Sequence, residues 1–403
     1  MSFLRFGYIT APLLGALWTF VACVTVAVAM SLATGEAFRP SLLWSLGIGI
    51  LFGLACLYLP SLIAALGMGC VAFLVMLFAG FGPILTGEVG TGAIVIAAIL
   101  AGVGTLWPIY AMLKDTHAGP LSRHEFEEAV IRFLTGFGYV FFTAIVAIPF
   151  YVMVMTSLKN QQQLVANPLD FSVDLSQGWG LFRSYFELFQ DFNFGTYMFN
   201  SLLISVLTVF ITLAFSIPGA YAVARLRFKG QAVFSRSILM IYMVPVIVLA
   251  LPIYIAFSMT GLRNTIVGIL LIYPVTTIPV ALYMLQGYFR GLPHEVEEAG
   301  LMDGLSRLAV IWKITLPLAL PAIASVSLYV FMIAWNEFLL AFMLLDDPSK
   351  FTLTRGIASL NSSEIPRQHL MAGAVVATVP ILALFLGLER FMTKGLTAGS
   401  VKG

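Results

Sequence analysis

The chain has 403 residues, of which 60% are hydrophobic and only 10% are charged, and its mean hydropathy is +0.99. A soluble protein of this length needs more surface charge, so the composition indicates an integral membrane protein with several spans. The net charge of +2 is spread along the chain and excludes the basic patches that nucleic-acid binding requires.

Ten apolar segments are long enough to cross a hydrocarbon core of about 30 Å. The first lacks a small-residue cleavage site, so we expect an uncleaved span. The expected fold class is all-α integral membrane, with about ten transmembrane helices. In chain order the segments are 8–32, 41–59, 62–85, 91–113, 134–156, 200–224, 237–259, 265–288, 321–345 and 370–391.

The placement of lysine and arginine predicts the orientation of these spans. With the N-terminus inside, the inner segments hold 14 of the 21 basic residues, so both termini are expected in the cytoplasm. Arg225, Arg227 and Lys229 are interpreted as anchors of this topology. Cysteine and histidine show no metal-ligand spacing, and no metal site is predicted.

The polar stretch 114–132 divides the chain into residues 1–120 and 121–403. Ser122 and Glu125 form a capping-box pattern, which predicts a short helix starting at Arg123. This helix either lies along the membrane surface before the fifth span or is an ordinary helical linker.

A second polar interruption, residues 293–316, follows the eighth span. Pro293 suits a first helical turn, and Gly304 can adopt the left-handed conformation that ends a helix. Ser306 can cap a second short helix, and Pro317 and Pro321 are expected to redirect the chain into the ninth span. The pattern predicts a helix, a turn and a helix at the cytoplasmic face.

The small residues Ala299 and Gly300 would allow a partner backbone to approach, and Glu298 offers a charge to a partner's Arg or Lys. The alternative is a solvated acidic loop. The spacing favours the docking loop, because it resembles the EAA loop of ABC-importer permeases, E-A-A-x3-G-x9-I-x-L-P. The matching or enclosed residues are Glu298, Ala299, Gly300, Asp303, Gly304, Ile314, Leu316 and Pro317. Gly300 departs from the usual Ala, and a mid-helix Gly costs roughly 1 kcal/mol.

From about residue 130 to the end, the chain resembles the second permease subunit of maltose-type sugar importers. The supporting segments include YAVARLRFKG at 221–230, LPHEVEEA at 292–299, WNEF at 335–338 and the tail GLTAGSVKG at 395–403. The resemblance implies a type I ABC importer core of six spans in the bacterial inner membrane. It also implies a sister permease, two ATPase subunits that use ATP and Mg²⁺, an external solute-binding protein and a sugar substrate. No cofactor is expected in this chain.

The first 120 residues depart from that family pattern, because they add four spans. Gly49/Gly53 and Ala98/Gly102 have the small-xxx-small spacing that lets membrane helices pack tightly. This extension either braces the sister subunit or coats the core. The tail either touches the ATPase dimer or is a frayed terminus.

A candidate solute path centres on Glu337, which is expected about two-thirds across the ninth span, since buried charge in a membrane needs a reason. With Trp335 and Asn336 it would form a polar fork beside an aromatic face, which suits a sugar. The alternative is a helix–helix hydrogen bond. Weaker candidates, near prolines of the seventh and eighth spans, are Tyr254, Tyr273 and Thr277.

These features predict a permease subunit of an ATP-driven sugar importer that couples to a separate ATPase. The chain has no G-x-x-x-x-G-K-[ST] loop, so ATP hydrolysis is expected on a partner and the chain itself is not an enzyme. The alternative is an ion-coupled secondary carrier for a small polar solute, which usually needs more intramembrane carboxylates.

Overall fold

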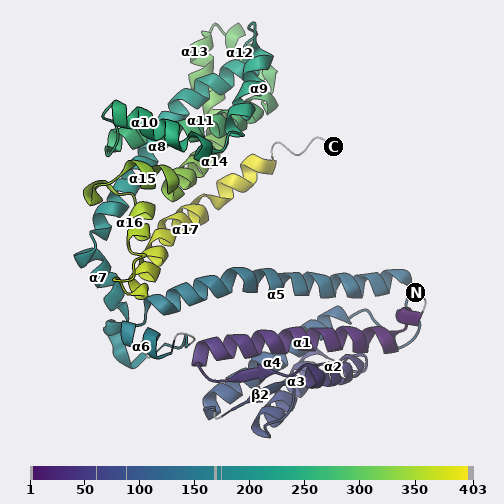
Figure 1. Cartoon of the computed structure of the whole chain (residues 1–403). Helices are drawn as coiled ribbons and strands as arrows, with labels where there is room; N and C mark the ends of the chain where they lie inside the picture. The colour runs from purple at the N-terminus through teal and green to yellow at the C-terminus, as the bar shows by residue number, and fades with distance from the viewer. Residues whose placement is uncertain (1–2, 60, 88, 168–169, 174, 398–403) are drawn as a thin grey trace. The chain divides into compact units, whose positions relative to one another are not determined.

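The computed structural model describes residues 3–59, 61–87, 89–167, 170–173 and 175–397, and it is mostly helical (Figure 1). The chain separates into two compact units, residues 1–181 and 182–403. The last six residues of the predicted ATPase-contacting tail lie outside the described residues.

The first unit is built from long apolar helices that pack in pairs, α1 along α2 and α3 along α4. Small residues at the helix contacts permit this packing. A Cβ added at Gly53 would lie 2.1 Å from the Ala11 carbonyl oxygen, and one at Gly102 would lie 2.6 Å from the Cys70 nitrogen. The predicted tight packing is therefore confirmed. The helices are η1 (Phe3–Arg5), α1 (Gly7–Thr34), α2 (Leu42–Cys56), α3 (Leu62–Phe78), α4 (Thr91–Met112), α5 (Arg123–Ser157), α6 (Gln161–Ala166) and η2 (Leu175–Phe182).

The third predicted span was too long, because α3 ends at Phe78. Gly80 and Gly82 follow with φ of 70° and 122°, a left-handed backbone that glycine adopts without strain. The chain then forms strand β2 (Ile84–Thr86), which pairs antiparallel with β1 (Phe38–Pro40). The sequence patterns did not predict this two-stranded sheet, whose strands are separated in the chain by α2 and α3.

Helix α5 begins at the predicted residue but is not a separate surface helix. The capping box is confirmed, since the Glu125 N–H donates to Ser122 Oγ and the Ser122 N–H donates to Glu125 Oε2. From this cap α5 runs for 35 residues to Ser157, so polar linker and fifth span are one helix.

The second unit packs α8 against α11 and α14, and α14 against α17. Its core holds large buried side chains, among them Phe194, Tyr273, Phe289 and Trp335. Its elements are α7 (Arg183–Asp191), α8 (Phe194–Arg225), α9 (Gln231–Tyr242), α10 (Val246–Met259), α11 (Ile266–Gly291), α12 (His294–Met302), α13 (Arg307–Val310), the π-helical turn η3 (Ile311–Thr315), α14 (Leu316–Asn336), α15 (Leu339–Leu344), η4 (Pro348–Lys350), α16 (Leu353–Ser359) and α17 (Arg367–Thr397).

Two predicted spans of this unit are broken. The segment 237–259 splits into α9 and α10 just before Val246, because Pro245 disfavours helical backbone in the preceding residue and lacks an N–H. The segment 321–345 splits into α14 and α15, because Glu337 is extended (φ −65°, ψ 124°) and its carboxylate caps the next helix.

Within the described residues, seven helices are long and apolar enough to cross a membrane. Three more apolar helices, α2, α3 and α10, are shorter. These ten correspond in order to the ten predicted segments, so the membrane character read from the sequence holds although several segment ends shift.

Candidate functional site

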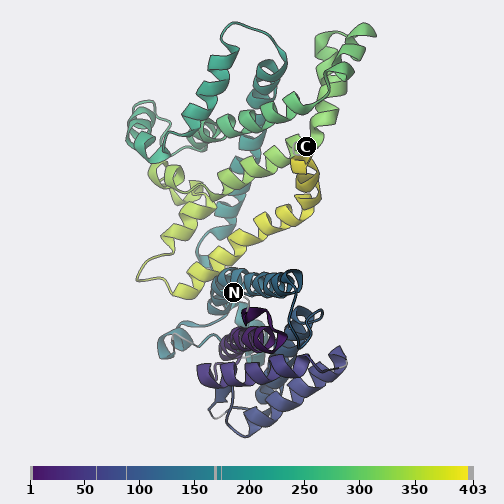
Figure 2. The same ribbon diagram turned by 90° about the vertical axis from the view of Figure 1, so that its right-hand side faces the viewer.

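The interruption at 293–316 forms two helices around a sharp turn at one end of the second unit (Figures 1 and 2). Gly304 has φ of 82°, as predicted for a residue that ends a helix. The Gly304 N–H donates to the Leu301 carbonyl at 3.1 Å, and the Leu305 N–H donates to the Gly300 carbonyl at 3.1 Å. This pair of bonds is the Schellman motif, which closes α12.

The second helix begins as predicted but does not end before the ninth span. Ser306 Oγ accepts the Ala309 N–H at 3.3 Å and caps α13. The helix then passes through the π turn η3 into α14, so one helical segment runs from Arg307 to Asn336. Pro317 does not redirect the chain. It lies in the first turn of α14, and the wider π turn before it accommodates the missing N–H.

Gly300 is buried against the second helix of the loop. A Cβ added there would lie 2.6 Å from Ile314 Cδ1 and 3.3 Å from Val310 Cγ2. Two positions of the predicted motif, Gly300 and Ile314, therefore touch each other. The third motif position holds Gly where the family has Ala, and this close contact leaves little room for a methyl group.

The outer face of the loop combines exposed charges with exposed apolar side chains. Glu298, Ala299, Asp303 and Gly304 are exposed, and in the described part of the chain no hydrogen bond or ion pair involves the Glu298 side chain. The exposed apolar side chains are Met302 at 88%, Leu308 at 70% and Trp312 at 72%.

Glu297, the residue before Glu298, holds the loop to the end of α8. Its carboxylate accepts hydrogen bonds from Tyr221 Oη at 3.2 Å and Thr315 Oγ1 at 3.1 Å, and lies 3.3 Å from Arg225 Nε. The Arg225 side chain is only 2% exposed and also donates to the Leu292 carbonyl at 2.7 Å. Sequence reasoning assigned Arg225 to topology and missed this contact, because nothing in the local pattern pairs residues so far apart.

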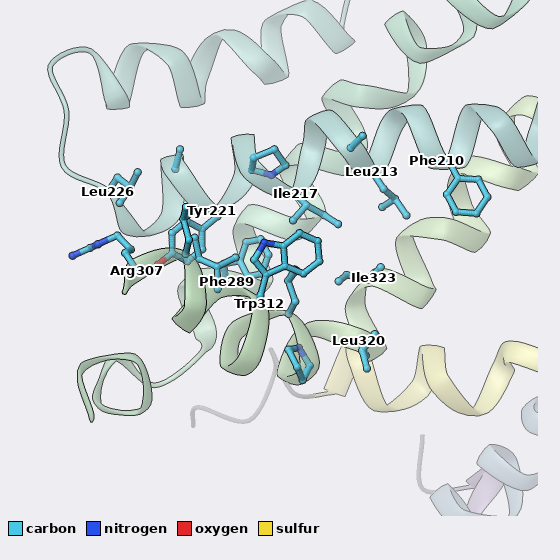
Figure 3. A pocket seen from close by; sticks show the side chains of 17 residues that line it. Phe210, Leu213, Ile217, Tyr221, Leu226, Phe289, Arg307, Trp312, Leu320 and Ile323 are labelled. Atoms are coloured by element: carbon cyan, nitrogen blue, oxygen red, sulfur yellow. The ribbon is translucent and has the colours of Figure 1, made fainter. Parts of the chain in front are cut away.

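An apolar groove of about 960 Å³ runs beside the loop, between α8 and the helix from α13 to α14 (Figure 3). Trp312 lies in the groove near Ile217 and Phe289, with Arg307 toward one end and Phe210 toward the other. The predicted motif residues Leu316 and Pro317 line it as well.

The candidate solute-path residues do not form one exposed lining. Trp335 is 1% exposed and its indole N–H donates to the Ala377 carbonyl at 3.1 Å, which joins α14 to α17. Thr277 shares a 2.6 Å hydrogen bond with Thr212 and joins α11 to α8, and Tyr273 is buried beside them. Tyr254 is half-buried under Arg263. The expected polar pair beside an accessible Trp335 ring is therefore absent from the described residues. The Trp335 ring is buried, and its N–H is hydrogen-bonded to a backbone carbonyl of α17.

Glu337 lies at the helix break rather than inside a continuous span. Its two carboxylate oxygens accept the Leu340 N–H at 2.8 Å and the Ala341 N–H at 3.1 Å. Asn336 beside it is exposed, and its amide donates to the Met332 carbonyl at 2.9 Å. The carboxylate thus caps the following helix and also interacts with the buried Tyr273 side chain of α11, so the contact between helices expected as the alternative is compatible with the fold.

Comparison with known proteins agrees with the motif. Residues 216–397 match the family described as "Binding-protein-dependent transport system inner membrane component". The chain is 38% identical over 269 residues to the inner membrane ABC transporter permease protein YcjP of Escherichia coli, an alignment that covers 66% of this chain and 95% of that protein. It is 32% identical over 282 residues to the trehalose/maltose transport system permease protein MalG of Thermococcus litoralis, covering 69% and 99%.

Among solved structures, a bacterial ABC transporter involved in the import of the acidic polysaccharide alginate matches with a TM-score of 0.57. The match covers 67% of this chain and 98% of that chain at 23% identity, and it supports the fold alone.

Proposed function

The chain belongs to the family of inner-membrane permease subunits of binding-protein-dependent ABC importers, and we propose that it forms half of the translocation path of a sugar importer. Several relatives are named for trehalose, maltose, diacetylchitobiose or arabinooligosaccharides, which supports a carbohydrate as the solute. The expected partners are a sister permease, two ATPase subunits and an external solute-binding protein. ATP and Mg²⁺ are expected only on the ATPase subunits.

One observation carries the coupling role: an exposed face sits on a loop that is fixed to the membrane helices. Glu298 and Met302 point outward without partners in the described chain, while Glu297 one residue earlier is tied to Arg225. A docking surface of this kind can transmit force, because the loop cannot fold away when an ATPase pushes on it.

The helical segment from Arg307 to Asn336 provides the path for that force. It starts in the docking loop and ends at the break before Glu337, so a movement of α13 becomes a movement of α14. We expect the core to rock between inward- and outward-open states as the ATPases close. Both termini and the loop are expected on the cytoplasmic side.

The test is to purify the tagged chain from its own host's membranes, wild type beside Glu298→Lys, and to identify the proteins that copurify. A sister permease and an ATPase should accompany the wild type. The ATPase should be lost from Glu298→Lys, because the reversed charge repels the basic partner group, while membrane insertion persists.

The ion-coupled carrier is the competing function, and energy dependence separates the two. Uptake in vesicles should require ATP inside and should survive collapse of the ion gradients. A chain that purifies alone and transports on an ion gradient would overturn the importer proposal.

A further inference from the structure

Arg355 lies on α16, at the end of the second unit away from the coupling loop (residues 293–316), and has no carboxylate partner among the described residues (Figure 1). Its guanidinium carbon lies 4.6 Å above the Phe342 ring and 4.3 Å above the Phe351 ring. Within the described residues it makes no ion pair or hydrogen bond, and its Nε is buried without an acceptor. The two rings stabilise the half-buried guanidinium, but its charge has no anionic partner in the described chain, which leaves it available to an anion.

The surroundings of Arg355 are rigid. Its helix α16 is fixed by a 2.7 Å hydrogen bond from the Leu353 N–H to Ser201 Oγ. Gly356 packs so closely on Tyr197 that an added Cβ would lie 2.2 Å from the ring. Thr354 Oγ1 donates to the Glu337 carbonyl at 2.6 Å and so ties α16 to the break after α14. The guanidinium is held in place before any ligand arrives.

An exposed aromatic surface continues from Arg355 toward the break. Phe342 is 51% exposed and Phe338 is 42% exposed, and their ring centroids are 5.2 Å apart. Asn336, exposed at the same break, adds a polar group. Aromatic faces suit the C–H face of a pyranose ring, and a guanidinium fork binds a carboxylate through two hydrogen bonds.

We propose that Arg355, with Phe338 and Phe342, binds an acidic saccharide, the carboxylate on Arg355 and the sugar ring on the exposed phenylalanines. The proposal rests on the proposed function, since it names the class of solute for that importer. The contrast with Arg263 supports it. Arg263 also lies over an aromatic ring, Tyr254 at 4.8 Å, but it is already neutralised by Asp346 at 2.5 Å.

The test is a saturation-transfer NMR titration of the complete transporter in nanodiscs, without its solute-binding protein. The probes are D-glucuronate and its neutral methyl ester, which differ in the charge and in one methyl group. The wild type should bind glucuronate about tenfold more tightly, because hydrogen bonds to charged groups are the strong ones. Arg355→Gln should remove the preference, and the matched control Arg263→Gln should keep it.

Arg355→Lys is a second variant that is less liable to misfold, because it keeps a cation over the rings. It loses the two-pronged guanidinium, so only part of the preference for glucuronate should remain. The proposal is overturned if the wild type binds neither probe or both equally, or if Arg355→Gln keeps the preference. If Arg355→Gln instead weakens docking of the solute-binding protein alone, a protein carboxylate is the partner and the saccharide site is refuted. ATP-dependent uptake by the same transporter, reconstituted in vesicles with its solute-binding protein, tests the importer function separately, since the binding titration needs no ATP.

Discussion

Two adjacent glutamates of the coupling loop lie in opposite environments. The Glu297 side chain is 13% exposed and has three partners, whereas the Glu298 side chain is exposed and has none in the described chain. We expect Glu297→Gln to lower the melting temperature of the purified protein, since removing a charge from a partly buried pair costs about 2 kcal/mol. Glu298→Gln should leave the melting temperature unchanged and lower ATPase recovery.

The two substitutions remove the same charge from neighbouring positions, so each is the control for the other. Thermal unfolding in detergent and ATPase copurification should be measured on both variants. Equal losses of stability would contradict the assignment of Glu297 as an anchor, and normal ATPase recovery with Glu298→Gln would contradict the assignment of Glu298 to docking.

Sequence rules predicted the local features of the loop and missed its tertiary anchor. Gly304 and Ser306 were predicted from helix-ending and capping preferences, which depend on neighbouring residues. The Arg225–Glu297 contact depends on how α8 and α12 come together in space, and no local pattern encodes it. For the same reason Trp335 was expected beside a solute although it is buried against α17.

At the scale of elements, hydropathy predicted the apolar helices but not their breaks. A hydrophobic run indicates that a segment is shielded from water. It does not indicate at which residue the helix ends. The break before α10 follows from Pro245, a visible signal, whereas the break after α14 follows from capping by Glu337. The β1–β2 sheet was missed because its strands have three residues each and lie on either side of α2 and α3 in the chain.

Close packing of α1 and α2 gives a prediction with a control on the same helix. Gly53→Ala should destabilise the chain, because its Cβ would meet a backbone oxygen of α1 at 2.1 Å. Gly47→Ala should stabilise it by about 1 kcal/mol through helix propensity, since nothing lies within 4 Å of a Cβ there. Thermal unfolding in detergent measures both, and equal shifts in one direction would argue against close packing of the two helices.

The contact between α7 and α17 should depend on pH through Glu187. His369 Nε2 lies 2.8 Å from Glu187 Oε2, and Arg183 Nε lies 2.6 Å from Oε1. The Arg183 guanidinium, followed by His369, lowers the pKa of the Glu187 carboxyl. A lowered pKa means that the stabilisation is present above the unfolded value of about 4.3 and is lost as pH falls through the folded value.

We therefore expect Glu187→Gln to melt below the wild type at pH 7 and the difference to shrink as pH falls below about 4. The effect should be modest, because Arg183 is 77% exposed and solvent weakens its part of the network. Melting curves across this pH range test it, and a difference that grows toward acid would reverse the sign of the argument.

At the scale of the whole molecule, the coupling proposal requires one orientation in the membrane. The basic residues predict that the loop around Met302 and the turn at Lys229 face the cytoplasm. From Met302, α13 and α14 form a single crossing to Glu337, so the exposed segment around Ser362, just before α17, must then face outside. Every ATPase contact proposed above depends on this arrangement.

Single cysteines at these three positions, in a chain whose own Cys23, Cys56 and Cys70 are replaced, test the arrangement directly. A membrane-impermeant maleimide should label Ser362→Cys in intact spheroplasts and should label Met302→Cys and Lys229→Cys only after the membrane is opened. Met302 is 88% exposed in this chain, so labelling after the membrane is opened and the ATPase is stripped off would show that protection in intact cells does not reflect burial in the fold. Labelling of Met302→Cys from outside would place the loop on the side of the membrane opposite to a cytoplasmic ATPase. This result would refute the coupling role despite the resemblance of the motif.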